Sequence, residues 1–388
     1  MMKLLIVLRN IGPYHNSRFE SLINLNLNIF VFETRPQSRE YLWNSSKDYK
    51  YPVYKFPRFN DDEKDISNRD IDNFYKIHIP LIKPDVIISI GWADRSYQRL
   101  LLFSNKNKIP IVIVSDSIIK TEKNRKRFFL KEIIKAFILK GYSSALVAGK
   151  ESKLYLEELG FSSKNIFSPW DVVDNKFFEE YKLNKNLNNN KYFLCVSRLL
   201  ERKNLFSLIE SFSNYQKLGG NWGLKIIGSG ELYSKLVEYS EIIIDRSKFE
   251  LINWLQIEDL VKYYKESSAF ILPSYFDNWG LVINEAIASG LPCIVSKNCG
   301  CAVDLIINNL SGFIFDPYDK KELVYFMQKI ENQSIEETLE MTDIAKSNLN
   351  NFDLDDFARG LEKASIRAIE KPRYSYYSSL ITRIISLI

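Results

Sequence analysis

The chain has 388 residues, more than one ordinary hydrophobic core requires, so two domains are the expected organisation. Its 46% hydrophobic and 26% charged residues are typical of a soluble globular protein, and no run approaches the roughly 18 apolar residues of a membrane span. Only two histidines and four cysteines occur, with no paired zinc-type spacing, which argues against a Cys/His metal centre and against a disulfide framework.

Short apolar runs rich in valine and isoleucine alternate with longer stretches along the first half. They cover residues 3–8, 28–33, 85–91, 109–117 and 144–149. The first run is too short for a secretory signal core and lacks a cleavage site, so we interpret it as a buried strand and expect a cytoplasmic protein. The alternation predicts an α/β fold with a parallel sheet and helices on both faces.

The net charge of +5 is unevenly placed, and a basic amphipathic segment lies between Lys120 and Lys140. An apolar stripe there alternates with basic residues, which predicts a helix. It is either a solvated helix on the sheet or a surface for anionic lipid head groups or a phosphorylated acceptor. Nucleic acid is not expected, since no nucleic-acid motif accompanies the patch. The basic residues are Lys120, Lys123, Arg125, Lys126, Arg127, Lys131, Lys135 and Lys140.

A polar, asparagine-rich stretch over residues 181–190 is the predicted linker. Apolar runs then resume at 191–197, 224–230, 249–255, 268–274 and 292–296. We therefore expect a first domain over residues 1–180 and a second over 191–350. Residues 351–388 should form a C-terminal helix and tail. In the tail, Leu380, Ile381, Ile384, Ile385 and Ile388 are expected to share one helical face.

The most informative segment is 273–296, PSYFDNWGLVINEAIASGLPCIVS. Asp277 stands eight positions before Glu285, with an Asn-Trp-Gly turn between them and a helical run that Gly290 ends. This order predicts a βαβ unit with a polar loop at the carboxyl end of a strand, where open α/β sheets bind ligands. Gly280 allows close backbone approach, and the first N–H groups of the helix suit an anion.

This pattern resembles the acidic-x7-acidic signature of the retaining glycosyltransferases of family 4, the glycosyltransferase group 1 proteins. The resemblance implies that the amides of Asn278, Trp279, Gly280 and Leu281 hold a nucleotide diphosphate. It implies that Glu285 binds the ribose and that Asp277 contacts the donor sugar. Asp277 is one methylene shorter than the glutamate usual in the family, which bears on the sugar contact more than on the nucleotide.

Further segments resemble the same family in the same order. Ser197 and Arg198 follow the first strand of the second half, and Lys203 lies five residues beyond Arg198. Such cations stabilise the charge that develops on a departing diphosphate. The resemblance also implies donor contacts from the Gly-x-Gly at Gly228 and a nucleotide-base wall at Trp254 and Leu255.

The first half matches more loosely. Gly12, in the loop after the first strand, corresponds to a family loop that contacts donor phosphate or acceptor, and His15 is a candidate acceptor residue or a plain surface histidine. Asp116 stands where the family commonly has a histidine at the donor sugar; it could accept a hydroxyl hydrogen bond or simply cap the basic helix. Asp94, after the strand at 85–91, is a candidate residue in the wall of the acceptor site. Residues 168–174 resemble the family's crossover between domains.

Together these features predict a GT-B architecture, two Rossmann-like parallel-sheet domains facing across a cleft. The resemblance implies a hexosyltransferase that moves a sugar from a nucleotide-diphosphate sugar to a glycan or lipid-linked acceptor, with retention and without a metal or other cofactor. A role in surface polysaccharide or glycoconjugate synthesis would follow, with contact at the inner face of the cell membrane. An inverting transferase, a sugar-nucleotide epimerase and a non-catalytic nucleotide-sugar-binding module remain alternatives.

Overall fold

The computed structural model describes residues 1–35, 48–56, 67–119, 125–181, 191–243 and 245–386. The described chain divides into two compact units. Unit 1 comprises residues 1–172 together with Leu354–Ile388, and unit 2 comprises Val173–Asp353. The first boundary lies eight residues earlier than the sequence suggested, because helix α6 (Asn175–Glu180) belongs to unit 2. The predicted linker lies, beyond Tyr181, outside the described residues.

Unit 1 is built on a parallel sheet in the order β3-β2-β1-β4-β5-β6-β7. Each central strand is a continuous apolar run, as expected of a parallel sheet covered on both faces; Leu4 to Val7 are fully buried. Its strands are β1 (Lys3–Leu8), β2 (Asn28–Glu33), β3 (Val53–Lys55), β4 (Val86–Ile90), β5 (Ile111–Ser115), β6 (Ser144–Val147) and β7 (Ile166–Phe167). Its helices are α1 (Pro13–Asn24), α2 (Asn68–Ile82), α3 (Arg95–Asn107), α4 (Arg125–Leu139), α5 (Lys150–Glu158), η2 (Ser163–Asn165), α14 (Leu354–Glu370) and α15 (Tyr376–Ile385).

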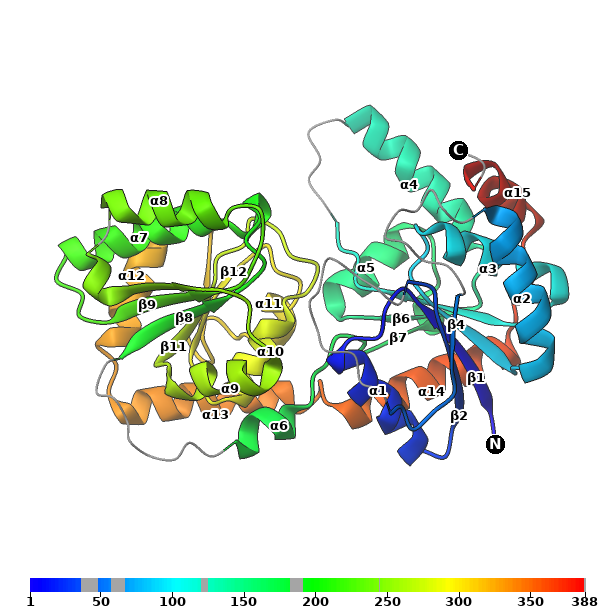
Figure 1. Ribbon diagram of the computed structural model, residues 1–388, viewed down its shortest axis with the longest axis horizontal. Helices are drawn as coiled ribbons and strands as arrows, with labels where there is room; N and C mark the ends of the chain where they lie inside the picture. The colour runs from blue at the N-terminus through cyan, green and yellow to red at the C-terminus, as the bar shows by residue number, and fades with distance from the viewer. Residues whose placement is uncertain (36–47, 57–66, 120–124, 182–190, 244, 387–388) are drawn as a thin grey trace. The chain divides into compact units, whose positions relative to one another are not determined.

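The C-terminal segment returns to unit 1 after unit 2 is complete. Helix α14, orange in Figure 1, packs against α1 and strands β5 to β7. Gly360 makes this approach possible, because a Cβ there would lie 2.7 Å from the carbonyl oxygen of Ser168. The Oγ of Ser144 on β6 donates to the carbonyl of Ala364 at 2.6 Å, inside the same contact. Two segments more than 200 residues apart therefore share one core.

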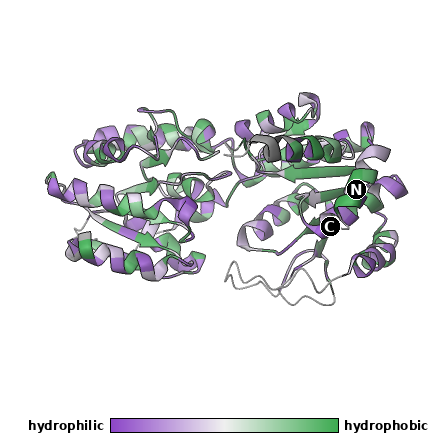
Figure 2. Ribbon diagram, turned by 90° about the horizontal axis from the view of Figure 1, so that it is seen from above, coloured by the Kyte–Doolittle hydropathy of each residue, from purple (hydrophilic) through white to green (hydrophobic). Residues whose placement is uncertain are grey.

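Unit 2 repeats the architecture with the sheet order β10-β9-β8-β11-β12-β13, all pairs parallel. The apolar strands of both sheets lie between helices whose outer faces are hydrophilic (Figure 2). The strands are β8 (Tyr192–Val196), β9 (Gly223–Ile227), β10 (Phe249–Ile252), β11 (Ala269–Leu272), β12 (Cys293–Ser296) and β13 (Phe313–Phe315). The helices are α6, η3 (Glu201–Lys203), α7 (Leu205–Lys217), α8 (Tyr233–Ile243), η4 (Arg246–Lys248), α9 (Ile257–Glu266), α10 (Leu281–Ala288), α11 (Ala302–Leu305), α12 (Lys320–Glu331) and α13 (Ile335–Leu349).

Candidate functional site

The strand order of unit 2 reverses between β8 and β11. From β8 the chain builds outward through β9 and β10, and from β11 it builds the other way through β12 and β13. Loops that leave the carboxyl ends of strands at such a switch point diverge, and open α/β sheets bind ligands there. The residues after β8 include Arg198 and Lys203, and those after β11 include Asp277 and Gly280. The topology therefore brings the two predicted motifs of the second half together.

The glycines after β9 let its loop lie directly on the loop after β8. A Cβ on Gly228 would lie 1.8 Å from the carbonyl oxygen of Ser197, and one on Gly230 would lie 2.5 Å from that of Leu199. Two backbone hydrogen bonds join the loops, from Leu199 N to Ser229 O at 2.8 Å and from Leu232 N to Leu199 O at 3.2 Å. The Gly-x-Gly thus packs backbone against backbone and sets the course of the segment that carries Arg198.

We expect Gly228→Ala to destabilise the protein by roughly 2–3 kcal/mol or more, because the new methyl group cannot fit without a backbone shift. Thermal denaturation of the full chain measures this. Gly219→Ala is the matched control: its φ of +89° imposes strain, but no atom lies within 4 Å of the new Cβ. If Gly228→Ala proved no less stable than Gly219→Ala, the close approach of the two loops would be contradicted.

A cluster of two cations around one carboxylate forms at the switch point. Lys203 is only 8% exposed, and its Nζ forms a short hydrogen bond with Oδ2 of Asp277. Arg202 Nη1 donates to Oδ1 of Asp277 at 3.3 Å and to the carbonyl of Phe276 at 3.2 Å. Sequence reasoning missed Arg202, although its position beside Lys203 was a signal. Two cations on one carboxylate leave a local positive charge, which suits an anionic ligand.

Asn204, directly after Lys203, adopts the left-handed conformation with φ of +58°. Asparagine tolerates this region better than most residues. Its Nδ2 donates to the carbonyls of Pro273 at 3.0 Å and Pro317 at 2.9 Å. Asn204 therefore makes the backbone turn, and its side chain joins the loops after β11 and β13 to the segment of Lys203.

The predicted turn before α10 has the expected backbone. Gly280 has φ of +109° and precedes Leu281, the first residue of the helix, so the first N–H groups of α10 lie at the switch point. Trp279 points the other way. It is 3% exposed and its Nε1 donates to Oδ1 of Asn284 at 2.9 Å, so its indole belongs to the core and only its backbone can serve a ligand. Asn278 beside it is half-buried.

A second loop holds this turn in place. Gly300 N donates to the carbonyl of Asp277 at 3.1 Å, and Cys301 N donates to that of Trp279 at 3.2 Å. Asp277 N in turn donates to the carbonyl of Asn298 at 3.2 Å. The buried Cys299-Gly300-Cys301 segment thus acts as a backbone support for the acidic loop.

Glu285 lies one turn into α10 and is 1% exposed. Its Oε2 accepts a hydrogen bond of 2.6 Å from the hydroxyl of Tyr264 on α9. Tyr264 was missed from the sequence, because nothing in its neighbourhood marks it. Nucleotide binding through Glu285 stays a prediction, in which a ribose would meet a carboxylate already oriented by this tyrosine. Trp254 and Leu255, after β10, are half-buried at the same edge of the sheet.

Unit 1 has its own switch point, between β1 and β4. Gly12 stands at the N-terminus of α1 after β1, and Asp94 at the N-terminus of α3 after β4. Asp94 is committed to local contacts: its Oδ1 accepts from Ser96 N and Ser96 Oγ, and Oδ2 lies 3.0 Å from Nη2 of Arg35. Asp94 lies in the loop after β4, as the sequence predicted. In the structure its side chain caps α3 and forms an ion pair with Arg35.

His15 is half-buried at the N-terminus of α1, where its side chain takes part in capping the helix. Its Nδ1 accepts from Gly12 N at 3.2 Å, which leaves the proton of the neutral ring on Nε2. Burial, with a smaller effect of the Arg18 charge, lowers the pKa of His15 from 6.5 to about 3. The ring is therefore a neutral hydrogen-bond donor at physiological pH. Its contact with the acceptor substrate stays a prediction.

This lowered pKa predicts a pH-dependent stability. Below pH 6.5 the unfolded chain binds a proton at His15, whereas the folded chain does not until the pH approaches 3. The free energy of unfolding therefore falls as the pH drops from about 6.5 toward 3. Above pH 6.5 the contribution of His15 to this free energy is constant. His15→Gln should flatten this slope in denaturant titrations at a series of pH values. His78→Gln, at the other histidine, is the control, and equal slopes for wild type and His15→Gln would contradict the prediction.

Asp116 is not the N-cap of a helix, because residues 117–119 directly after it are not helical. Instead its charge acts on Arg18, a buried guanidinium that no sequence pattern marks. Burial lowers the pKa of Arg18, and the negative charges of Asp171 and Asp116 oppose this. Arg18 donates from Nε and Nη2 to the carbonyl of Val172 at 3.0 and 2.7 Å and lies 4.6 Å from the centre of the Trp170 ring. It anchors the predicted crossover segment in unit 1.

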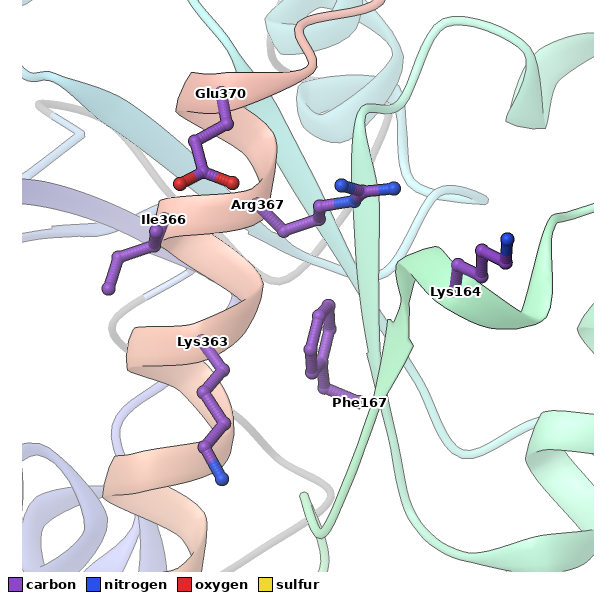
Figure 3. Close-up of a pocket in the computed structure, with 6 residues that line it drawn as sticks. All are labelled: Lys164, Phe167, Lys363, Ile366, Arg367 and Glu370. Carbon is purple, nitrogen blue, oxygen red and sulfur yellow. The ribbon is translucent and has the colours of Figure 1, made fainter.

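A separate shallow cavity lies beside β7 and α14 (Figure 3). Lys164 precedes β7, so this cavity lies at the amino end of that edge strand, away from the switch-point loops. It is not part of the candidate site. Its lining residues are Lys164, Phe167, Lys363, Ile366, Arg367 and Glu370.

In the part of the chain that the structure describes, no three His, Cys, Asp or Glu side chains lie together so as to hold a metal ion. The expectation that no metal or cofactor is needed stays a prediction.

Comparison with known structures defines the class of fold. HepE from Anabaena in complex with UDP and glucose superposes with a TM-score of 0.73 at 14% identity, covering 93% of this chain and 98% of HepE. Trehalose-6-phosphate synthase, studied for glycosyl transfer with retention, superposes with a TM-score of 0.74 at 12% identity over 94% and 98% of the two chains. The two Rossmann-like units therefore form a GT-B fold.

Residues 177–348 match the family Glycosyl transferases group 1. The capsular polysaccharide biosynthesis glycosyltransferase CapM of Staphylococcus aureus is 30% identical over 193 residues, and this similarity spans about half the length of each chain. The matched residues lie within unit 2, so unit 2 carries a domain of the glycosyl transferases group 1 family.

Proposed function

We propose that the protein is a hexosyltransferase that moves a sugar from a nucleotide-diphosphate sugar to a glycan or lipid-linked acceptor. The observation that carries this proposal is the switch point of unit 2, where the segment bearing Arg198 and Lys203 meets Asp277 and the N-terminus of α10. Positive side chains and helix amides together are what a diphosphate requires. The complex of HepE with UDP and glucose supports a nucleotide-sugar donor.

The proposed mechanism follows from where charge develops. As the bond between the anomeric carbon and the diphosphate breaks, negative charge grows on the leaving oxygen, and the fixed cations and helix amides stabilise it. The leaving diphosphate takes the proton of the acceptor hydroxyl, and the acceptor oxygen bonds to the carbon on the same face. Retention follows, and no protein nucleophile takes part. The study of trehalose-6-phosphate synthase as a retaining enzyme supports this stereochemistry.

Within this mechanism Asp277 has a second role, which is to position the two cations. Since both its oxygens contact cations, it holds Lys203 and Arg202 in place, and its contact to the donor sugar forms as the ligand enters. Unit 1 supplies the groups for the acceptor, with the Nε2–H of His15 as a hydrogen-bond donor. CapM, a capsular polysaccharide enzyme, supports a role in surface glycan synthesis, which would take place at the inner face of the cell membrane.

The test is a panel of UDP, GDP and ADP sugars. A matching nucleotide at about 100 times its dissociation constant should stabilise the protein by roughly 2.7 kcal/mol. The same sugar nucleotide should be slowly hydrolysed, and NMR should find the released sugar in its original anomeric form. An inverted anomer would indicate an inverting transferase, an epimerised nucleotide sugar an epimerase, and binding without turnover a binding module.

A further inference from the structure

Helix α15, near the C-terminus, buries two of its polar residues and exposes several of its large apolar residues. Ser378 and Thr382 are fully buried. Tyr376, Leu380 and Ile384, spaced at i, i+4 and i+8 on one stripe, are 77%, 44% and 53% exposed. A surface helix of a globular protein normally shows the opposite arrangement. The outward stripe, joined by the exposed Tyr377, is therefore unlike an ordinary solvated face.

Hydrogen bonds fix this orientation. Ser378 Oγ donates to the carbonyl of Ile138 at 2.8 Å in the buried contact between α15 and α4. Ser375 N donates to Oδ1 of Asn105 on α3 at 2.9 Å. Space is limiting as well, because a Cβ on Gly141 would lie 2.5 Å from Oγ of Ser378. A rotation that buried the apolar stripe would break these contacts, so the stripe is held outward.

The structure corrects the face expected from the sequence. Leu380 and Ile384 point outward, whereas Ile381 and Ile385 are half-buried and pack on the core of unit 1. Ile388 lies outside the described residues. The tail therefore divides its apolar residues between the core and the surface, and Tyr376 and Tyr377 extend the outward part.

The charged residues of α15 and of the segment 371–375 just before it are all positive. Arg383 is the one charged residue of α15, and it is exposed. The segment just before it contributes the exposed Lys371 and Arg373. On the described part of α4, the acidic Glu132 forms an ion pair with Lys135. Lys131 on α4 and Lys140, just after the helix, are exposed; Lys120 and Lys123 of the predicted basic segment lie outside the described residues.

Helix α4 adds apolar surface next to this charge. It packs beside α15 (Figure 1), and its Leu130 and Ile133 are exposed. Apolar side chains bordered by tyrosines and cations are the composition of helices that lie in the interface plane of a membrane. Among the described residues no helix is long and apolar enough to cross a bilayer.

We propose that α15 and α4 form a docking surface for an anionic lipid bilayer, with Tyr376, Tyr377, Leu380 and Ile384 entering the head-group region. The surrounding cations favour a lipid surface, because they attract anionic head groups. In a symmetric dimer the same cations would face each other and repel. This docking rests on the proposed function, because it would bring unit 1 to a lipid-linked acceptor. Vesicle binding and nucleotide binding are separate measurements, so either proposal can fail while the other holds.

The test is co-sedimentation of the full chain with phosphatidylcholine vesicles, with or without phosphatidylglycerol, at low and high salt. We expect binding to the anionic vesicles that salt weakens. The double variant Leu380→Glu, Ile384→Glu should lower the bound fraction about tenfold or more, since it places charge in the apolar stripe. Ile335→Glu, Leu339→Glu, at two exposed positions with the same spacing on α13, is the matched control and should bind as wild type does.

Tyr376→Ser, Tyr377→Ser provides a second, milder variant should the first be poorly folded, and it should also bind less. Equal binding of wild type and both α15 variants would overturn the proposal, and so would absence of binding to anionic vesicles at low salt. A dimer that Leu380→Glu, Ile384→Glu dissolves, seen by analytical ultracentrifugation without lipid, would assign the stripe to a second copy instead. Nucleotide binding, measured in parallel, should be unchanged in every α15 variant.

Discussion

Alanine at Arg198 or at Lys203 is expected to lower turnover by about 100-fold or more, as removal of a fixed charge stabiliser commonly does. The two variants should differ in stability. Arg198 is half-buried in the loop after β8, so its loss should leave the fold intact. Lys203 is nearly buried beside Asp277, so its removal leaves a carboxylate with less compensation and should cost roughly 1–3 kcal/mol as well.

Release of nucleotide diphosphate from the donor measures turnover, and thermal denaturation measures stability. Lys262→Ala is the control, because Lys262 is exposed on α9 and pairs only locally with Asp259 among the described ion pairs. Near-normal turnover in both Arg198→Ala and Lys203→Ala would remove these residues from the site. Arg202→Ala adds information: a loss of donor affinity without loss of stability would make it a further diphosphate ligand.

Glu285→Gln is expected to weaken binding of the free nucleotide diphosphate by about 10- to 100-fold, since a hydrogen bond to a charged group contributes roughly 1.5–3 kcal/mol. Glutamine keeps the size of the side chain, so the buried position on α10 should stay filled. Asp277→Asn should instead change the discrimination between donor sugars more than it changes nucleotide affinity.

Tyr264→Phe separates binding from positioning. It removes the hydroxyl that donates to Glu285 but leaves the carboxylate charged. If Glu285 meets the ribose directly, Tyr264→Phe should bind nucleotide far better than Glu285→Gln does. Calorimetry with UDP and the corresponding diphosphates measures both. Unchanged affinity in Glu285→Gln would reassign Glu285 to a purely structural pair with Tyr264.

The core strands were predictable because a parallel sheet buries both faces and leaves continuous apolar runs. Each of the ten apolar runs overlaps a strand of the structure. Three strands were missed, namely β3, β7 and β13, which are two or three residues long and lie at sheet edges. So short a run carries no periodicity, and only its neighbours in the sheet define it.

The candidate site could be located from sequence because its residues follow strands, and the carboxyl ends of parallel strands meet at one edge. The partners of those residues could not be predicted, because they come from distant segments. Lys203 bonds to Asp277 from 74 residues earlier in the chain, and Tyr264 reaches Glu285 from another helix. Likewise, the outward stripe of α15 depends on hydrogen bonds to α3 and α4 that sequence periodicity does not contain.

The most direct test of the central claim is hydrogen exchange of the full chain with and without UDP, or with whichever diphosphate stabilises it best. We predict slower exchange in three segments of unit 2, at residues 197–204, 228–232 and 277–285, since these carry the backbone amides and cations of the switch point. Protection confined to unit 1, or a tightly bound nucleotide that leaves these three segments unchanged, would contradict the assignment of the donor site.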